Sequence, residues 1–321
     1  MKKMCIAFVL VIAGMIPLFA DDVTELDIMR PAVKASADFI PKSRFGDHEV
    51  AMQSGELSLS IPLTKAQLHQ GESVYLFQPL LNIRGGVLHP DISFFGGTHL
   101  VEQGGVSLSA LWITASRNFY ALTAGVNLSE EVRSASRIKP TPYAVFMGGC
   151  RIADSLILIY GAGISYNSEM YRVNFPVFPL LGLRWKISET VSMSMILPFN
   201  VSVRIKAGTG FKITCYLNGM SKVFRMYNEN DSIWFFGRNE IVTVKMSALT
   251  TGVKLDYHFD EHFFLSGNVG LLAGRKFSVW EGKDRIFQDN VKSSLYCKVS
   301  VGYQFGDRER LLDREEETPV Q

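Results

Sequence analysis

Cysteine is scarce in this chain, with four among 321 residues. Cys5 lies near the start, and Cys150, Cys215 and Cys297 are far apart. Without Cys5, three widely spaced cysteines remain, and this odd set gives neither a disulfide framework nor the spacing of a metal site. We therefore expect these cysteines to be small apolar residues on strands, and we expect no cofactor or metal.

Long hydrophobic runs are also missing after residue 20, because no stretch there reaches the 18 apolar residues of a membrane-spanning helix. Apolar residues nevertheless make up 47% of the chain and aromatic residues 12%. A large apolar surface must therefore be buried or face lipid. A β-barrel satisfies both observations, since alternation along a strand dilutes the apolar signal.

Net charge is small as well, at +2 for the whole chain. The chain has 33 basic and 31 acidic residues, and without Lys2 and Lys3 the basic residues would also number 31. A neutral mature chain argues against general binding to nucleic acid.

The N-terminus has the pattern of an export signal. Lys2 and Lys3 precede an apolar run from Ile6 to Phe19, and Ala20 is followed by acidic residues. The run is shorter than a spanning helix requires, so we predict a cleaved signal peptide at residues 1–20. Cys5 lies too early for lipid attachment after cleavage.

The segment from Val191 to Ala207 has an apolar residue at every second position, with mainly polar residues between them. A period of two predicts an extended strand with one apolar face. As a single strand it would be about three times the usual length in soluble domains. A long strand of this kind in an exported chain predicts an outer-membrane β-barrel of a Gram-negative cell.

Similar stripes recur across residues 49–305, and we count about 12 strands, within a range of 8 to 14, of an antiparallel up-and-down transmembrane barrel. Residues 21–48 are predicted to be a mature N-terminal extension. The stripe at 241–259 changes phase near Thr250–Gly252, which predicts a β-bulge. The segments 227–239 and 280–290 are candidate extracellular loops.

A periplasmic β-sandwich or β-helix is the alternative fold. A sandwich would have shorter strands and a more charged outer face, and a β-helix would show a repeat that this sequence lacks.

The last predicted strand ends in Tyr303 and Phe305, which resemble the C-terminal signal that the barrel-assembly machinery recognises. This resemblance implies the assembly machinery and periplasmic chaperones as partners. The signal normally ends a chain, whereas here residues 306–321 follow, with more acidic than basic side chains. We predict that this charged tail is a solvated periplasmic extension; binding of a partner protein is the alternative.

Four loose motifs follow one another in the predicted barrel: FPVFPLLGLRW at 175–185, Leu197-Pro198, GFKI at 210–213 and GLLAGRK at 270–276. In this order they resemble an uncharacterised outer-membrane β-barrel family of Gram-negative bacteria, with small OmpW-type barrels as a distant cousin. The resemblance implies a barrel, a lipid environment and an outer-membrane location. It implies no known activity.

If the apolar stripes face lipid, the opposite phase points into the lumen. A charge on the lipid face would cost roughly 2–4 kcal/mol near the midplane, which favours this assignment. The predicted lumen-lining residues are Arg184, Lys186, Arg204, Lys206, Lys212, Lys245, Lys254, Asp256 and Lys298. An excess of bases in such a wall favours anions, although lysines at strand ends can instead extend to lipid headgroups.

We find no catalytic constellation and predict that the chain is not an enzyme. His258 and His262 flank a turn with acidic neighbours, which suits a metal or acid–base site but equally a wet polar turn. The leading hypothesis is a passive or anion-preferring channel for small solutes. The alternative is a closed structural or surface-interaction barrel that acts through its extracellular loops without transport.

Overall fold

The computed structural model describes residues 31–64, 67–68, 74–93, 95, 99–114, 118–131, 140–166, 177–197, 200–227, 241–281 and 284–305. The predicted signal peptide, the charged tail and most of the predicted loop 227–239 lie outside these residues. In the described part of the chain, no helix is long and apolar enough to cross a membrane.

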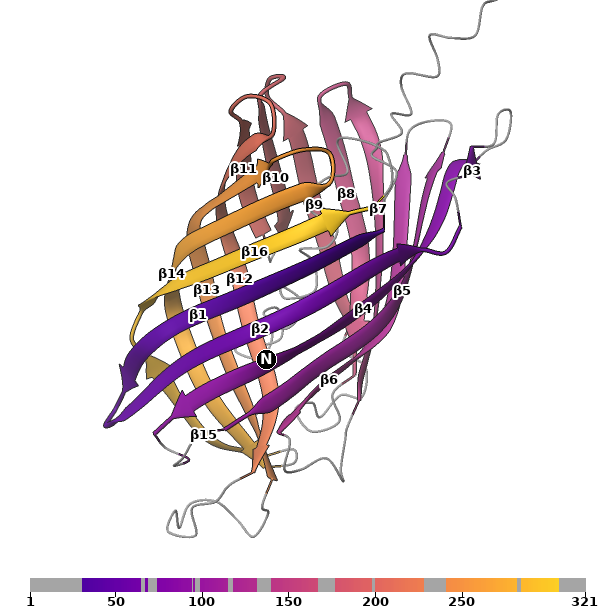
Figure 1. Ribbon diagram of the computed structural model, residues 1–321. Helices are drawn as coiled ribbons and strands as arrows, with labels where there is room; N and C mark the ends of the chain where they lie inside the picture. Colours follow the sequence, from indigo (N-terminus) through magenta and orange to yellow (C-terminus); the bar gives the residue numbers. More distant parts are fainter. Residues whose placement is uncertain are drawn as a thin grey trace, which may run out of the picture.

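Fourteen antiparallel strands form a closed barrel in which each strand pairs with its neighbours in the chain (Figure 1). Their bounds are β1 (Ala32–Phe45), β2 (His48–Pro62), β4 (Val74–Ile92), β5 (Val101–Thr114), β6 (Phe119–Glu131), β7 (Thr141–Ala153), β8 (Leu156–Ser165), β9 (Val177–Lys186), β10 (Val191–Leu197), β11 (Asn200–Lys206), β12 (Phe211–Tyr227), β13 (Ile241–His258), β14 (Phe263–Glu281) and β16 (Ser294–Gln304). The prediction of an all-β antiparallel barrel is confirmed, at the upper end of the predicted strand range.

The barrel closes between its first and last strands, where Ala32 pairs with Gln304 and Phe39 pairs with Cys297. Residues 32–45 therefore belong to the wall, although the sequence interpretation had placed them in an extension before residue 49. Their outward side chains include the small residues Ala35 and Ala37, so the apolar stripe that predicts the other strands is weak here.

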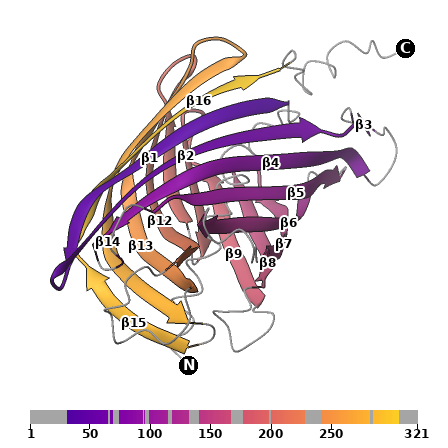
Figure 2. The same cartoon turned by 60° about the horizontal axis from the view of Figure 1, so that its bottom comes forward.

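Two shorter strands accompany the barrel. The two-residue strand β3 (Gln67–Leu68) pairs with β4. Strand β15 (Asp284–Val291) pairs with the last part of β14 (Figure 2). It continues β16 in the same register, because Arg275 pairs with Val291 and Leu272 with Ser294. The segment 280–290 is thus mostly strand, and its prediction as a loop was wrong.

The two ends of the barrel differ. One end, called the terminal end here, holds the start of β1, the end of β16, short turns at 154–155, 187–190, 207–210 and 259–262, and the longer connection from β2 to β4. At the opposite end, called the distal end, lie the turn at Gly46 and the ends of strands that longer stretches of sequence join, such as β6 with β7 and β12 with β13. Most short turns thus lie at the terminal end, and short turns at one end are typical of outer-membrane barrels.

The outside of the barrel is apolar. Each of the fourteen strands carries at least one exposed large apolar side chain, such as Val299 and Val269. A continuous apolar belt of this kind exceeds the patches that soluble proteins expose, and it suits contact with lipid.

The stripe from Val191 to Ala207 is a hairpin, not one long strand. The chain reverses direction between Leu197 and Asn200, and Met193 of β10 pairs with Val203 of β11. Odd-numbered residues pair with odd-numbered residues, so the apolar face continues through the turn without a change of phase. A period of two therefore could not reveal this turn.

The bulge predicted near Thr250–Gly252 is also absent from the β12–β13 pairing, which keeps one register from Phe211–Tyr257 to Tyr227–Ile241. The irregularity lies between β13 and β14, beside Gly274, whose φ is 57°. The apolar residues of β13 change face instead: Val244 and Met246 point inward and are fully buried, whereas Val253 and Leu255 are exposed outside.

Candidate functional site: the barrel interior

A row of polar residues crosses the inner wall in the terminal half. Its members pair one after another across the strands, as Lys186, Ser192, Arg204, Thr214, Lys254, Asn268, Lys298, Asp38 and Ser54. We call this set the polar row. Cross-strand partners share a face of the sheet, and this face is opposite the exposed apolar belt. The row thus gathers four cations and one acid on the inner wall.

A second set lies one step nearer the terminal end. Lys206 pairs with Lys212, Lys212 with Asp256, and Asp256 with Ser266. Lys254 Nζ lies 3.2 Å from Asp256 Oδ2, and the Ser266 hydroxyl donates a 2.6 Å hydrogen bond to Asp256 Oδ1. The acid therefore offsets part of the local positive charge.

Arg184 lies on the other side of the polar row, paired with Ser194, and is almost fully buried. Eight of the nine residues predicted to line the lumen thus share one face in the register: Arg184, Lys186, Arg204, Lys206, Lys212, Lys254, Asp256 and Lys298.

Lys245 differs from this set. It lies between the inward-facing Val244 and Met246 on β13, so it points to the opposite side of that strand from Lys254. The sequence interpretation had placed both lysines inside because it inferred a bulge between them. Without that bulge, the odd separation of the two positions puts their side chains on opposite faces.

Lys186 is the last residue of β9, and its side chain contacts the turn that follows this strand. Its ammonium donates hydrogen bonds of 2.8 and 2.7 Å to the two carboxylate oxygens of Glu189. This ammonium holds the pKa of the exposed Glu189 carboxyl below its usual value. The terminal end therefore also contains an ion pair, in which Glu189 offsets the positive charge of Lys186.

Asp38 is the centre of a network that sequence reasoning missed. Its carboxylate lies 3.2 Å from Lys298 Nζ and 3.4 Å from Lys222 Nζ, and it accepts a 3.0 Å hydrogen bond from the Ser54 hydroxyl. Lys222 Nζ also donates to Ser54 Oγ at 3.1 Å. Since Lys222 belongs to β12, this network joins β12 to β1 and β2 across the interior.

A second contact joins distant strands at the distal end. Arg225 of β12 pairs in parallel with Glu130 of β6, and Arg225 Nη1 lies 2.8 Å from Glu130 Oε1. Beside it, His99 Nδ1 lies 3.0 Å from Glu131 Oε1, and both side chains are buried. The strands β7 to β11 separate β6 from β12 along the wall. The barrel is therefore drawn together at this end.

An apolar core fills the interior between the drawn-together strands. It includes the fully buried Phe45, Val50, Leu88, Phe224 and Phe277, which come from β1, β2, β4, β12 and β14. A barrel of about eight strands is narrow enough for side chains to fill. Eight of the fourteen wall strands contribute residues to this core, namely β1, β2, β4, β5, β12, β13, β14 and β16. The inner face of the barrel is thus polar in the terminal half, whereas apolar side chains fill the interior at the distal end.

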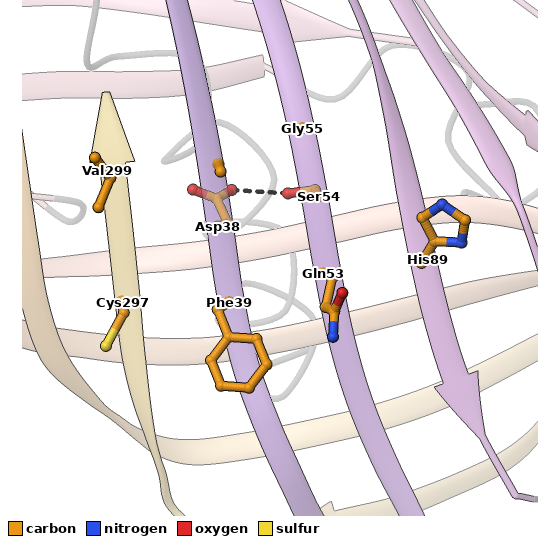
Figure 3. A pocket seen from close by; sticks show the side chains of 9 residues that line it. Asp38, Phe39, Gln53, Ser54, Gly55, His89, Cys297 and Val299 are labelled. Carbon is orange, nitrogen blue, oxygen red and sulfur yellow. Dashed lines mark hydrogen bonds between the residues drawn. The ribbon is translucent and has the colours of Figure 1, made fainter. Parts of the chain in front are cut away.

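A hollow on the barrel wall lies near the same network but on its outer face (Figure 3). Its lining includes Ala37 and Gly55, which pair across β1 and β2, and the outward-facing Phe39, Cys297 and Val299. Figure 3 also shows the Ser54–Asp38 hydrogen bond at the hollow. Because its apolar lining belongs to the exposed belt, we do not count this hollow as part of the interior.

The histidines singled out in the sequence do not form a cluster of ligands. His262 Nδ1 lies 3.0 Å from the carbonyl oxygen of Gln304, and the His258 ring lies 5.8 Å from that of Phe264. Among the described residues, no group of three or more histidine, cysteine or acidic side chains is placed to hold a metal ion.

The aromatic residues of the predicted assembly signal form a cluster with the first residue of β14, Phe263. Tyr303 lies 4.7 Å from Phe263 and 4.8 Å from Phe305, measured between ring centroids. The backbone N–H of Phe305 donates a 2.8 Å hydrogen bond to the carbonyl of Pro31. These contacts tie the last strand to both of its neighbours.

The interior residues that sequence reasoning missed are Asp38, Ser54, Lys222, Arg225 and Glu130. Asp38 fell within the supposed extension, and the continuation of β12 beyond Leu217 has no clear apolar stripe. A signal was nevertheless present, because lone charges at Asp38 and Lys222 interrupt otherwise strand-like segments.

Comparisons with known proteins match barrels only at the level of fold. No family model and no curated protein matches the chain. An outer membrane channel from Pseudomonas putida F1 aligns with a TM-score of 0.43 and 8% identity, over 88% of this chain and 99% of that one. The translocator domain of the autotransporter NalP from Neisseria meningitidis aligns with a TM-score of 0.36 and 12% identity, over 94% and 98%.

A third match is the KdgM porin in complex with disordered oligogalacturonate, with a TM-score of 0.33 and 12% identity, over 84% of this chain and 99% of that one. Scores this low carry no argument about what the chain binds or transports.

Proposed function

We propose that this chain is an outer-membrane barrel whose basic inner face handles small anionic solutes. The polar row is the observation that carries the proposal, because Lys186, Arg204, Lys254 and Lys298 follow one another on the inner wall with Asp38 as the acid of that row. Fixed positive charge in a wall of low dielectric raises the local concentration of anions.

The width of the barrel and its surface support this proposal. A ring of fourteen strands is closer to the 16–18 strands that leave an aqueous channel than to the eight that side chains fill. The exposed apolar belt on every strand supports a position in a lipid bilayer, and the predicted export signal favours the outer membrane.

The second candidate function is a closed barrel that acts through its distal connections without transport. The apolar core at the distal end favours this candidate, because residues such as Phe224 and Phe277 fill the interior there. The two candidates differ in whether solutes can pass this core.

Electrical recording from the purified protein in planar bilayers tests the proposal. Under a salt gradient, the reversal potential should report a preference for anions, and higher salt should weaken it, since the Debye length is about 10 Å at 0.1 M. Replacing Arg204→Glu together with Lys212→Glu should reduce or invert the preference. Both residues lie on the inner face of the terminal half.

Lys42→Glu provides a matched control, because Lys42 forms an exposed ion pair with Asp91 near the distal end, 3.5 Å apart. It should leave the reversal potential unchanged. Cation preference in the unmodified protein would contradict the anion proposal. An absence of conductance, both in this protein and in the opened variants of the next subsection, would favour the closed barrel.

A further inference from the structure

Strand β12 extends far beyond its neighbour in the wall. It has 17 residues, whereas β11 has 7. The two strands pair from Lys206–Lys212 to Asn200–Asn218. Beyond Asn218, residues 219–227 continue as a hairpin with β13. This distal half of the β12–β13 hairpin is free of β11 and reaches across to other parts of the barrel.

The two faces of β12 are held by different ion pairs. Lys222 lies on the even-numbered face and contacts Asp38 of β1, with side chains that are 16% and 15% exposed. Arg225 lies on the odd-numbered face and contacts Glu130 of β6, with side chains that are 10% and 8% exposed. Ion pairs therefore hold β12 on both faces, to β1 on one side and to β6 on the other. Neither of these strands is a neighbour of β12 in the order of the wall.

The hairpin also supplies much of the distal core. Phe224 and Met226 of β12 and Val244 and Met246 of β13 are at most 1% exposed. They belong to the same cluster as Phe45 of β1. In this position the hairpin contributes to the apolar core that fills the interior at the distal end.

We propose that residues 219–227 of β12 and 241–248 of β13 form a gate, closed by the Lys222–Asp38 and Arg225–Glu130 ion pairs. This inference rests on the proposed function, because a gate has a role only if solutes pass. A wall strand is normally held by a ladder of backbone hydrogen bonds. On its β6 side, the described part of this hairpin instead has one bridging residue pair, Arg225–Glu130, supported by an ion pair.

Removing Arg225 takes away the cation that faces the buried Glu130 carboxylate, which favours separation of the two elements. The ion pairs therefore favour the closed position, together with the apolar core and the pairing of β13 with β14. Asp38 also contacts Lys298, so the gate shares one carboxylate with the polar row.

Accessibility of a core position measures gate opening without any need for conduction. The starting protein would have Cys150, Cys215 and Cys297 replaced by alanine and Val244→Cys introduced, because Val244 is fully buried in the closed position. In lipid nanodiscs, a water-soluble methanethiosulfonate reagent should label this cysteine slowly. Lys222→Gln with Arg225→Gln should speed labelling about tenfold, the factor given by about 1.4 kcal/mol.

A charge exchange separates gating from damage to the fold. Glu130→Arg with Arg225→Glu restores an ion pair at the same place and should return labelling to the slow rate, whereas Arg225→Glu alone should not. Lys42→Gln with Asp91→Asn removes an exposed ion pair and should change nothing. Heat-modifiable gel mobility would show that each variant is a folded barrel.

The outcomes are distinct. Slow labelling in a folded Lys222→Gln, Arg225→Gln variant would overturn the gate and show a permanent plug. Faster labelling with a rise in conductance supports both proposals. Faster labelling without conductance would support the moving hairpin and contradict the channel.

Discussion

Lys206 of β11 lies directly opposite Lys212 of β12 on the inner face of the terminal end. Like charges at directly opposed positions destabilise a pair of strands by roughly 0.2–1 kcal/mol. Natural sequences accept such local conflicts mainly at functional sites. Under the proposed function, this pair would add positive charge to the inner face at the terminal end.

A first prediction separates stability from selectivity at this pair. Lys212→Thr should raise the free energy of unfolding of the barrel, measured with a denaturant, by a few tenths of a kcal/mol. The reason is that it removes the repulsion between Lys212 and Lys206. The same change should lower the anion preference in bilayer recordings. A loss of stability together with unchanged selectivity would mean that Lys212 has a structural role.

A second prediction tests whether β1 closes the barrel. Phe39 pairs with Cys297, and the two side chains lie on neighbouring strands at the outer hollow (Figure 3). The Cα atoms of antiparallel partners are about 4.5–5.5 Å apart, within the range of a disulfide. Phe39→Cys should therefore form a disulfide with the native Cys297.

The unreduced protein should then migrate differently from the reduced protein on a denaturing gel. The same variant carrying Cys297→Ala is the matched control and should show no such difference. If residues 32–45 were an extension outside the wall, oxidation would leave the mobility unchanged.

A third prediction tests the hairpin at 191–206. Met193 and Val203 are partners in the structure, so cysteines at these positions should cross-link in a background that lacks the native cysteines. In one continuous strand they would be about 33 Å apart, at about 3.3 Å per residue. Met193→Cys with Ile205→Cys is an off-register control and should cross-link less efficiently. Failure of the in-register pair would restore the single-strand interpretation.

A fourth prediction concerns assembly. Phe305→Ala should reduce insertion into the outer membrane in cells, since Phe305 packs on Tyr303 and resembles the residue recognised by the barrel-assembly machinery. Deleting residues 307–321 should leave insertion nearly intact. Phe259→Ala removes another exposed aromatic ring at the same end and is the matched control. Normal insertion of Phe305→Ala together with failure of the truncated chain would place the signal in the tail.

The sequence by itself determined the kind of fold and which residues share a face. Alternation along segments such as 295–305 is enough to predict strands, because the side chains of a strand point to opposite sides in turn. It also placed Lys254 and Lys298 opposite the apolar belt, since a charge is costly in lipid. These inferences are local and do not depend on which strands are neighbours.

Strand ends were decided by the tertiary structure. The reversal between Leu197 and Asn200 leaves the alternation intact, because the register of β10 and β11 pairs odd positions with odd positions. The pattern was therefore the same for one strand and for two. The strand β1 was missed because small residues such as Ala35 and Ala37 give a weak stripe, whereas pairing with β16 fixes its place.

Whether an apolar stripe points into the barrel or out of it also could not be predicted from the sequence. Val244 and Leu255 lie on opposite faces of one regular strand. Val244 is apolar because it packs in the interior core, whereas Leu255 belongs to the exposed apolar belt outside. A period of two shows which residues share a face, but not whether that face meets lipid or a core. The contacts of Lys222 with Asp38 and of Arg225 with Glu130 required the closed barrel, because only closure brings such distant segments of the chain together.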